Sequence, residues 1–452
     1  MNADRPGHQF RLLGQRRYGP FFAAVTLGTI NDNLLKFAVT LLLTWHVPLP
    51  GLSAADVGPL TGALFILPSL LLSASAGQWA DKWPLDRLIR WGKALEIAMM
   101  ALAAWALWHR QGVWLLACLL LSGTHVTVFA TLKYAYLPRH LGDAELIGGN
   151  GLMEMGLFTG ILIGTLTAGI LMDAGALWPG LPPDLVPWLL PAALIGLAVL
   201  GWGCAQGVPA TPAVDPALRL HFNPVRDTWT ELRRVARQPG GMLPVLGISW
   251  MWFFGAIYLS LFPVLTKEIL HGAPSVATVL LVVMSLGIGV GALSCEALAH
   301  RRLAPARLVV LGATGMALFA TDLAVCAWSL SAARGPGDVS VLDWRAFLAA
   351  PEHLRVLVDV WCMAMAVGWF SVPLYARLQQ VAEPSHRARL IAANNIVNAL
   401  FILMSAALVG GLLAFGVTLA GVLGVTAALQ GLFCLLAWSR HRAMLETWPW
   451  KN

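Results

Sequence analysis

Polar and ionisable side chains interrupt the first long apolar segment, at roughly residues 21–45. Asn31, Asp32 and Asn33 are followed by Lys36 in a stretch that is otherwise almost entirely apolar. A charged side chain at the centre of a bilayer costs about 2.5–3.5 kcal/mol on insertion scales, so these groups need partners, and such groups commonly line a pathway or a substrate site. Because Asp32 and Lys36 are four residues apart, they share a helix face. We predict either a charged wall of a transport cavity or a mutually neutralising pair.

Further ionisable groups fall in two later apolar segments of the same half. His125 lies in the middle of the fourth segment and Lys133 near its end, while Asn150 and Glu154 are again four residues apart in the fifth. A buried carboxylate such as Glu154 needs a cation, for which Lys36 or Lys133 is available. Two simpler interpretations stay open: Lys133 extends its ammonium to the membrane surface, and His125 is an ordinary packed, hydrogen-bonded histidine.

The second half carries amides and aromatic rings where the first half carries charges. Asn394 and Asn395 lie in the eleventh apolar segment, and the segment at 243–266 is aromatic and uncharged. We expect one cavity with a polar wall from the first half and an apolar wall from the second half. Glu96 is a weaker candidate for the polar wall. Such a cavity suits an amphiphilic substrate.

The composition is that of an integral membrane protein. Of the 452 residues, 58% are hydrophobic and 12% are charged, whereas a soluble domain has about 25% charged residues. The net charge is +7, but the basic residues gather in the loops of one side, which is an orientation signal rather than a sign of nucleic-acid binding. The six cysteines stand singly, and no spacing predicts a metal site, a disulfide framework or a cofactor.

Twelve apolar segments are long enough to cross a bilayer. They fall at 20–46, 55–76, 91–108, 113–136, 146–172, 185–205, 243–266, 275–297, 306–330, 354–377, 389–412 and 416–438. With the N-terminus inside, most Lys and Arg residues fall in cytoplasmic loops, which predicts an even number of spans and both termini in the cytoplasm.

These segments predict an all-α membrane protein built from two six-helix bundles. The bundles comprise residues 1–205 and 241–452, and a basic cytoplasmic linker at 206–240 joins them. Residues 223–238 of the linker are predicted to form an amphipathic helix. Two bundles that rock about a central site are the layout of a transporter.

A short motif lies between the second and third segments, on the predicted cytoplasmic side. Gly77, Asp81 and Arg87 resemble the loop signature of the major facilitator superfamily, Gly-x-x-x-Asp followed by basic residues. Glycine permits a tight exit from the membrane, and Asp81 can pair with a helix N-terminus or a neighbouring basic group. We predict a latch that holds one state of the cycle; the simpler interpretation is an ordinary charged loop. Gly291 with Glu296 is a weaker copy in the second half.

Several segments together resemble the bacterial lysophospholipid transporter family, a branch of the major facilitator superfamily. The resemblance covers nearly the whole chain, is strongest in the first half, and rests on residues 31–37, 77–87, 132–134, 150–154 and 392–395. It implies a major facilitator fold of twelve transmembrane helices. It also implies inward flipping of lysophospholipids, such as lysophosphatidylethanolamine, across the bacterial inner membrane. Membrane lipids would surround the protein there. A separate acyltransferase/acyl-ACP synthetase would then re-acylate them.

The same resemblance implies that Asp32 and Lys133 help to form the headgroup site. Typical members also carry an arginine in the seventh span, whereas this chain has no Lys or Arg between Arg237 and Lys267. We expect Asp32 to be central, with Lys36 as its partner. The complete predicted substrate site comprises Asp32, Lys36, Lys133, Glu154, Asn150, His125, Asn394 and Asn395.

Three other functions stay open on the sequence. The first is an exporter of small amphipathic or drug-like compounds. The second is a membrane-embedded lipid acyltransferase, which would need a His followed by an Asp after four residues to abstract a hydroxyl proton. No histidine has that spacing, and His140 is followed by Glu145 instead. The third is a membrane scaffold that does not transport.

Overall fold

The computed structural model describes residues 9–45, 54–172, 182, 184–238, 241–300, 303–333, 342–349 and 351–447. Within these ranges the regular elements are helices, and the one sheet-like pairing is a single bridge between Gly272 and Leu342. Helices are expected because an apolar segment in lipid must satisfy its backbone hydrogen bonds within itself.

Twelve long helices account for most of the described residues. Those of the first half are α2 (Gly19–Trp45), α3 (Ala54–Lys82), α4 (Leu85–Trp108), α5 (Gly112–His140), α6 (Leu146–Met172) and α8 (Val186–Gln206). Those of the second half are α10 (Met242–Glu268), α11 (Pro274–His300), α12 (Pro305–Ala333), α14 (Pro351–Val381), α15 (Arg387–Ala414) and α16 (Leu419–Thr447). The predicted segments therefore match helices. The largest differences are that α16 ends at Thr447 rather than at 438, that α3 ends at Lys82 rather than at 76, and that α4 begins at Leu85 rather than at 91.

Ten of these helices are long and apolar enough to cross a membrane, and α2 and α4 are not among the ten. The reason is that α2 carries Asp32 and Lys36, while α4 carries Lys93 and Glu96 among other charges. The charged side chains of α2 and α4 thus lower the mean hydropathy of both helices.

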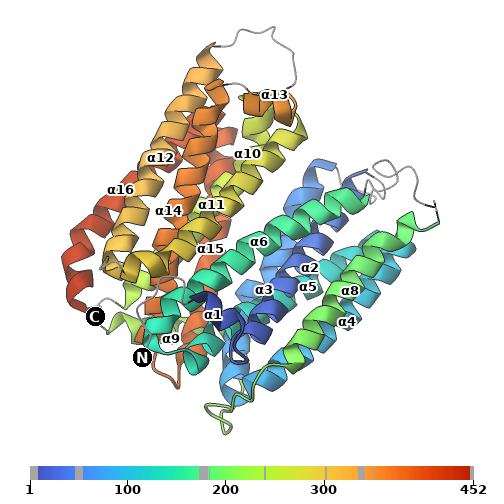
Figure 1. The fold of residues 1–452 in the computed structure, drawn as a ribbon, viewed down its shortest axis with the longest axis vertical. Coiled ribbons are helices and arrows are strands. Elements are labelled where there is room, and N and C mark those ends of the chain that lie inside the picture. The colour runs from blue at the N-terminus through green and yellow to red at the C-terminus, as the bar shows by residue number, and fades with distance from the viewer. Residues whose placement is uncertain are drawn as a thin grey trace.

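The helices form two groups that meet at one end and diverge toward the other (Figure 1). In the first group α2 packs on α6 and α8, and α3 on α5; in the second, α14 packs on α11 and α12, and α16 on α12. The groups touch through α3 with α15 and through α6 with α11. We call the end where they meet, near α1 (Gln9–Leu13), the closed end, and the opposite end the open end.

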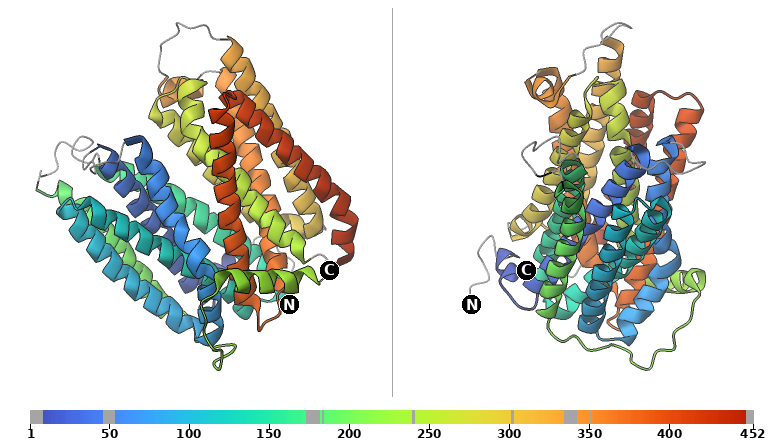
Figure 2. Two further views of the ribbon diagram at one scale, coloured as in Figure 1. Left: turned by 180° about the vertical axis from the view of Figure 1, so that it is seen from behind. Right: turned by 90° about the vertical axis from the view of Figure 1, so that its right-hand side faces the viewer.

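The linker crosses the closed end. Its helix α9 (Pro224–Ala236) begins after Asn223, whose side chain accepts a hydrogen bond from the Arg226 backbone N–H at 3.0 Å. Figure 2 shows α9 lying across the bundle ends, where it packs on α15 and α3. The predicted helix is present: Val235 faces the core, and the exposed side carries Arg226 and Arg233 together with Val225 and Trp229.

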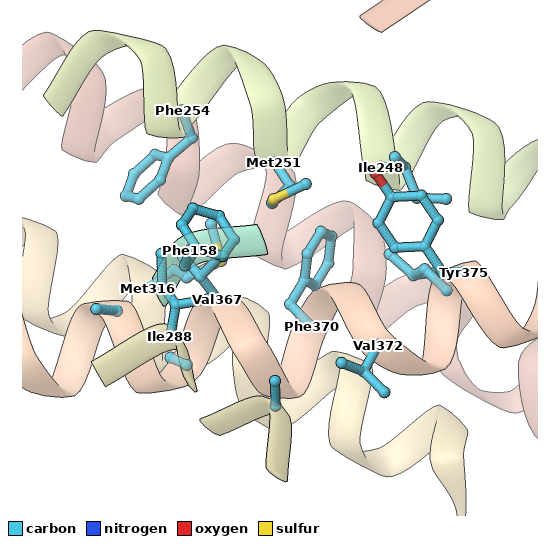
Figure 3. Packing of buried hydrophobic residues seen from close by; sticks show 14 of the residues in the cluster. Phe158, Ile248, Met251, Phe254, Ile288, Met316, Val367, Phe370, Val372 and Tyr375 are labelled. Carbon is cyan, nitrogen blue, oxygen red and sulfur yellow. The ribbon is translucent and has the colours of Figure 1, made fainter. Parts of the chain in front are cut away.

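The apolar core runs from one bundle into the other. Phe158 of α6 lies beside Met251 and Phe254 of α10 and beside Ile288 of α11 and Val367 of α14 (Figure 3). A first-bundle aromatic ring is therefore seated among second-bundle side chains at the middle of the molecule.

Candidate transport site

A cavity of about 580 Å³ lies between the two bundles, on the side of the open end. Four helices form its walls: α2 and α6 from the first bundle, and α10 and α11 from the second. The lining residues are Asn33, Lys36, Phe37, Thr40, Phe158, Ile161, Leu162, Thr165, Leu166, Gly169, Ile170, Leu259, Thr278, Leu281, Met284 and Ser285. Among them Lys36 is the single ionisable side chain, and it faces hydroxyl and apolar groups.

Lys36 is not paired as the sequence suggested. Its ammonium lies 4.9 Å from the centre of the Phe65 ring on α3 and forms no ion pair with any residue that the structure describes. Asp32 turns away, accepting a hydrogen bond from the Ser122 hydroxyl at 2.5 Å and facing His125. Asp32 and Lys36 therefore do not form the expected ion pair. Each side chain contacts its own neighbours, because adjacent turns of α2 face different helices.

Asp32 and His125 belong to a buried cluster inside the first bundle. His125 Nδ1 lies 3.7 Å from Asp32 Oδ2, and His125 Nε2 lies 3.5 Å from Glu96 Oε2. Glu96 in turn accepts from Lys93 at 2.6 Å and from the Asn31 amide at 3.1 Å. All these side chains are at most 6% exposed. The cluster joins α2, α4 and α5 immediately behind the cavity wall.

Lys133 and Glu154 form a second buried pair, nearer the closed end. Lys133 Nζ lies 4.0 Å from Glu154 Oε1, and the Tyr134 hydroxyl donates to the same oxygen at 2.6 Å. Tyr134 stacks on Tyr375 of α14 at 4.3 Å, and Tyr375 accepts from the Trp252 indole at 3.0 Å. The interpretation that Lys133 extends to the surface is wrong, since its side chain is 7% exposed.

The predicted asparagines lie where the bundles touch. Asn150 of α6 and Gln379 of α14 exchange two hydrogen bonds, at 2.9 and 3.0 Å. Asn395 of α15 donates to Thr131 of α5 at 3.4 Å. Asn394 is 1% exposed, and neither its amide nitrogen nor its oxygen has a hydrogen-bond partner among the described residues. Asn150 and Asn395 therefore tie the bundles together, and none of the three asparagines lines the cavity.

Gly77 and Asp81 of the predicted gating motif lie at a contact between the bundles at the closed end. Asp81 of α3 accepts from Arg389 Nε of α15 at 2.8 Å and lies 3.9 Å from Arg139 of α5. Gly77 is inside α3 rather than at a membrane exit, and an added Cβ would lie 2.9 Å from the Ala392 Cβ. Arg87 is exposed and has no ion pair within the described residues, and the basic groups next to Asp81 are Arg389 and Arg139.

Further contacts close the same end. Glu296 of α11 accepts from the backbone N–H of Gln9 at 3.0 Å, and the Gln9 amide donates to the Leu293 carbonyl oxygen. Arg17 donates to Glu145 at 2.5 and 2.8 Å, and these hydrogen bonds raise the pKa of the Arg17 guanidinium. Glu296, the weaker motif copy, thus contacts the first bundle as Asp81 contacts the second.

The α9 helix is anchored to this closed end. The Gln78 amide donates to Asp227 at 2.8 Å, and Glu231 lies 3.6 Å from His386 at the start of α15. Burial, with Arg389 and Arg234 nearby, lowers the pKa of His386 below its ordinary value of 6.5.

The family assignment comes from comparison with known proteins. The profile of the Major Facilitator Superfamily matches residues 21–400. The chain belongs to the major facilitator superfamily. Because this superfamily and the relatives below are transporters, the chain is a multi-pass membrane transporter rather than an enzyme.

Some relatives of this chain carry a more specific name than that of the superfamily. It is 26% identical over 439 residues to the lysophospholipid transporter LplT of Cronobacter sakazakii, covering 94% of both chains. It is 26% identical over 272 residues to the protein of that name in Klebsiella pneumoniae, covering 59% of this chain and 62% of that one. This second match thus spans less than two thirds of the relative's length.

Solved structures of the superfamily share the fold. The human organic anion transporter MFSD10 superposes with a TM-score of 0.69 at 14% identity, over 96% of this chain and 100% of that chain. A bacterial homologue of the iron transporter ferroportin gives 0.64 at 14% identity, over 94% of this chain and 100% of that chain. These likenesses establish the major facilitator fold.

Sequence reasoning missed several residues of the buried cluster and of the contacts at the closed end. Lys93 is fully buried and bonded to Glu96, yet it was not singled out. A Lys and a Glu three residues apart in an apolar stretch were the available signal. Arg139 and Arg389 gave no such signal, because nothing local distinguishes a latch arginine from any other basic residue at a helix end.

Proposed function

We propose that this transporter flips lysophospholipids such as lysophosphatidylethanolamine inward across the bacterial inner membrane by alternating access. In this proposal the closed end is cytoplasmic, both termini lie there, and a separate acyltransferase/acyl-ACP synthetase re-acylates the product. The supporting observation is the cavity between the bundles, in which one unpaired lysine faces a largely apolar wall.

Lys36 supplies the headgroup contact. An ammonium without an acidic partner, in a cavity that also presents Thr40, Thr165 and Ser285, attracts an anion and offers hydroxyls for hydrogen bonding. A phosphodiester meets both demands, and charge-assisted hydrogen bonds to such an anion are roughly twice as strong as neutral ones. The phosphate of a single-chain phospholipid is the group that we assign to this position.

The acyl chain follows the apolar wall. Phe158 and Ile161 of α6 face Leu281 and Met284 of α11 across the cavity. These two helices approach each other at the closed end and diverge toward the open end (Figure 1). A single chain can therefore lie between α6 and α11 while the headgroup reaches Lys36.

Lys133 and Glu154 are assigned to the later part of the cycle. Of the eight residues predicted for the substrate site, Lys36 alone lines the cavity of this structure. Lys133 and Glu154 lie nearer the closed end, beneath the contacts that tie the bundles. When these contacts open, the phosphate passes from Lys36 to Lys133, and the amine of the headgroup meets Glu154.

The test is transport by the purified protein in proteoliposomes. Fluorescent lysophosphatidylethanolamine is added outside, and the fraction that albumin can no longer extract measures inward flipping. Lys36→Gln should lower the initial rate about tenfold or more, as expected when a buried charge-assisted contact is lost, and Lys36→Arg should retain most of it. Lys267→Gln is the matched control, since this lysine is exposed at the end of α10 and does not line the cavity.

Two results would contradict the proposal. One is a wild-type rate equal to that of protein-free vesicles. The other is equal rates for wild type and Lys36→Gln. Export of amphipathic compounds by the same vesicles, without inward lysolipid movement, would favour the drug-exporter alternative instead.

A further inference from the structure

A second cavity, of about 460 Å³, lies at the closed end on the flank of the second bundle. Its walls come from α10, α12, α14 and α16, together with the last residue of α9 and the turn that follows it. We call it the flank cavity, and Met242, Leu246, Phe370, Phe433 and Arg440 are among its lining residues. It shares no lining residue with the cavity between the bundles, so the two cavities are separate.

The flank cavity opens outward through a gap between α10 and α16. Trp250 of α10 stacks on Phe433 of α16 at 4.8 Å, and these two rings bound the cavity on the side away from the closed end. Phe370 points from α14 toward α10 and forms the inner wall (Figure 3). Leu246 and Leu436 line the cavity and are 45% and 57% exposed, so they lie at its mouth. Exposed leucines on membrane-spanning helices face acyl chains, and the mouth therefore opens to lipid.

Positive charge gathers at this mouth. Arg440 is the one ionisable side chain among the lining residues; it is exposed and forms no ion pair with any residue that the structure describes. Arg237 lies between two lining residues at the end of α9, Arg307 lies two residues before a lining residue of α12, and both are exposed. No acidic side chain is part of the described lining. The cavity thus combines an apolar interior with an unpaired guanidinium at its entrance.

A phospholipid matches both parts of the cavity. The planar guanidinium of arginine binds two phosphate oxygens at once through parallel hydrogen bonds. Basic pockets between transmembrane helices on the cytoplasmic side are suited to lipid headgroups. A headgroup with a net negative charge is preferred over a zwitterionic one, because the amine of the latter would meet the further arginines Arg237 and Arg307.

We propose that the flank cavity binds one anionic diacyl phospholipid of the cytoplasmic leaflet, with its phosphate at Arg440 and an acyl chain against Phe370 and Phe433. Only the assignment of the closed end to the cytoplasm rests on the proposed function. The bound lipid is not the transported one. Alternating access needs a site that both bundles share, whereas apart from the end of the linker the flank cavity is built from the second bundle alone.

The first test counts the phosphatidylglycerol molecules bound to the detergent-purified full chain by native mass spectrometry. The wild type should keep one phosphatidylglycerol at a concentration at which phosphatidylethanolamine with the same acyl chains is lost. Arg440→Gln should weaken the affinity about tenfold, as expected when a charge-assisted hydrogen bond is lost. Leu246→Trp should also weaken it by filling the mouth. Arg16→Gln is the matched control, since this arginine is exposed and does not line the flank cavity.

The second test maps the lipid in proteoliposomes. Phosphatidylglycerol with a photoactivatable group in one acyl chain is incorporated, irradiated, and located on the protein by peptide mass spectrometry. Adducts should concentrate on residues 242–247 and 433–440, in excess over the exposed face of α8 around Leu200. Arg440→Gln should remove that excess. Unlabelled phosphatidylglycerol should compete for these positions, and lysophosphatidylethanolamine at the same concentration should not.

Three results would overturn the flank site. They are equal affinities of wild type and Arg440→Gln, adducts spread evenly over the exposed helices as for ordinary bilayer contact, and displacement by lysophosphatidylethanolamine, which would assign the cavity to the transported lipid. Because neither test requires transport, the two proposals can fail separately. Arg440-dependent binding of phosphatidylglycerol to a protein that flips no lysolipid would support the flank site and contradict the proposed function.

Discussion

Arg389 of α15 donates from Nε to Asp81 Oδ2 of α3 at 2.8 Å, across the boundary between the two bundles. The Asp81 side chain is fully buried, and that of Arg389 is 20% exposed. This bond joins residues 308 positions apart in the chain. In the proposed alternating-access cycle this bond must break before the closed end opens, so we expect it to stabilise the conformation seen here relative to the opposite one.

Removing either partner should shift the protein toward opening of the closed end. We expect Asp81→Asn to raise the ratio of open to closed forms at this end about tenfold, which corresponds to about 1.4 kcal/mol. Spin labels at Arg87→Cys and Glu383→Cys, both exposed, measure the distance between the bundles. The exchanged pair Asp81→Arg with Arg389→Asp should restore part of the closed population; an exchanged pair that opens as far as the single variant would exclude a specific latch.

Gly77 should tolerate no side chain in the closed conformation. An ideal Cβ at this position would lie 2.9 Å from the Ala392 Cβ and 3.0 Å from the Arg389 Cα. Gly77→Val should therefore separate α3 from α15, lengthening the label distance at the closed end and slowing transport. Gly62→Val is the matched control in the same helix, since an added Cβ there meets nothing within 4 Å. Similar effects of the two substitutions would show that helix propensity, rather than contact, is responsible.

Lys36 should determine discrimination between charged and neutral single-chain lipids. The wild type should flip lysophosphatidylethanolamine faster than a monoacylglycerol of the same chain length, because only the former has a phosphate for the ammonium. Lys36→Gln should bring the two rates together by slowing the phospholipid. Competition between the two lipids in the albumin extraction assay measures this ratio. An unchanged ratio would place headgroup recognition elsewhere.

Docking of α9 should weaken as the pH falls. Burial and the nearby Arg389 and Arg234 lower the pKa of His386 in the docked form, so the undocked form binds more protons at acidic pH. The docked form is therefore favoured at pH values above the ordinary histidine pKa of 6.5 and loses that advantage as the pH falls through the lowered pKa.

The mobility of a spin label at the exposed position Arg226→Cys measures this docking. Mobility should rise on acidification in the wild type and stay constant in His386→Gln. Because His221 also contacts Asp227 in this region, His221→Gln is the control and should retain the response. If His221→Gln, rather than His386→Gln, removed the rise in mobility, the pH response would belong to His221 of the linker.

The sequence by itself determined the class of protein, the helices and the presence of ionisable groups within them. Long apolar segments in lipid leave the backbone little alternative to helix, so the helix positions follow from local composition. Asp32, His125 and Glu154 were recognisable because an ionisable group in such a segment is costly wherever it faces. The Gly77–Asp81 motif was recognisable because its spacing is local.

Only the tertiary structure decided which of these groups meet. The four-residue spacing allowed an Asp32–Lys36 pair, yet Asp32 faces Ser122 and His125, while Lys36 faces the cavity. The partner of Asp81 is Arg389 rather than the nearby Arg87. The physical reason is that spacing along a helix fixes only the direction of a side chain. The identity of its neighbour depends on packing between helices that are distant in the sequence, and that packing separates the cluster from the cavity on α2.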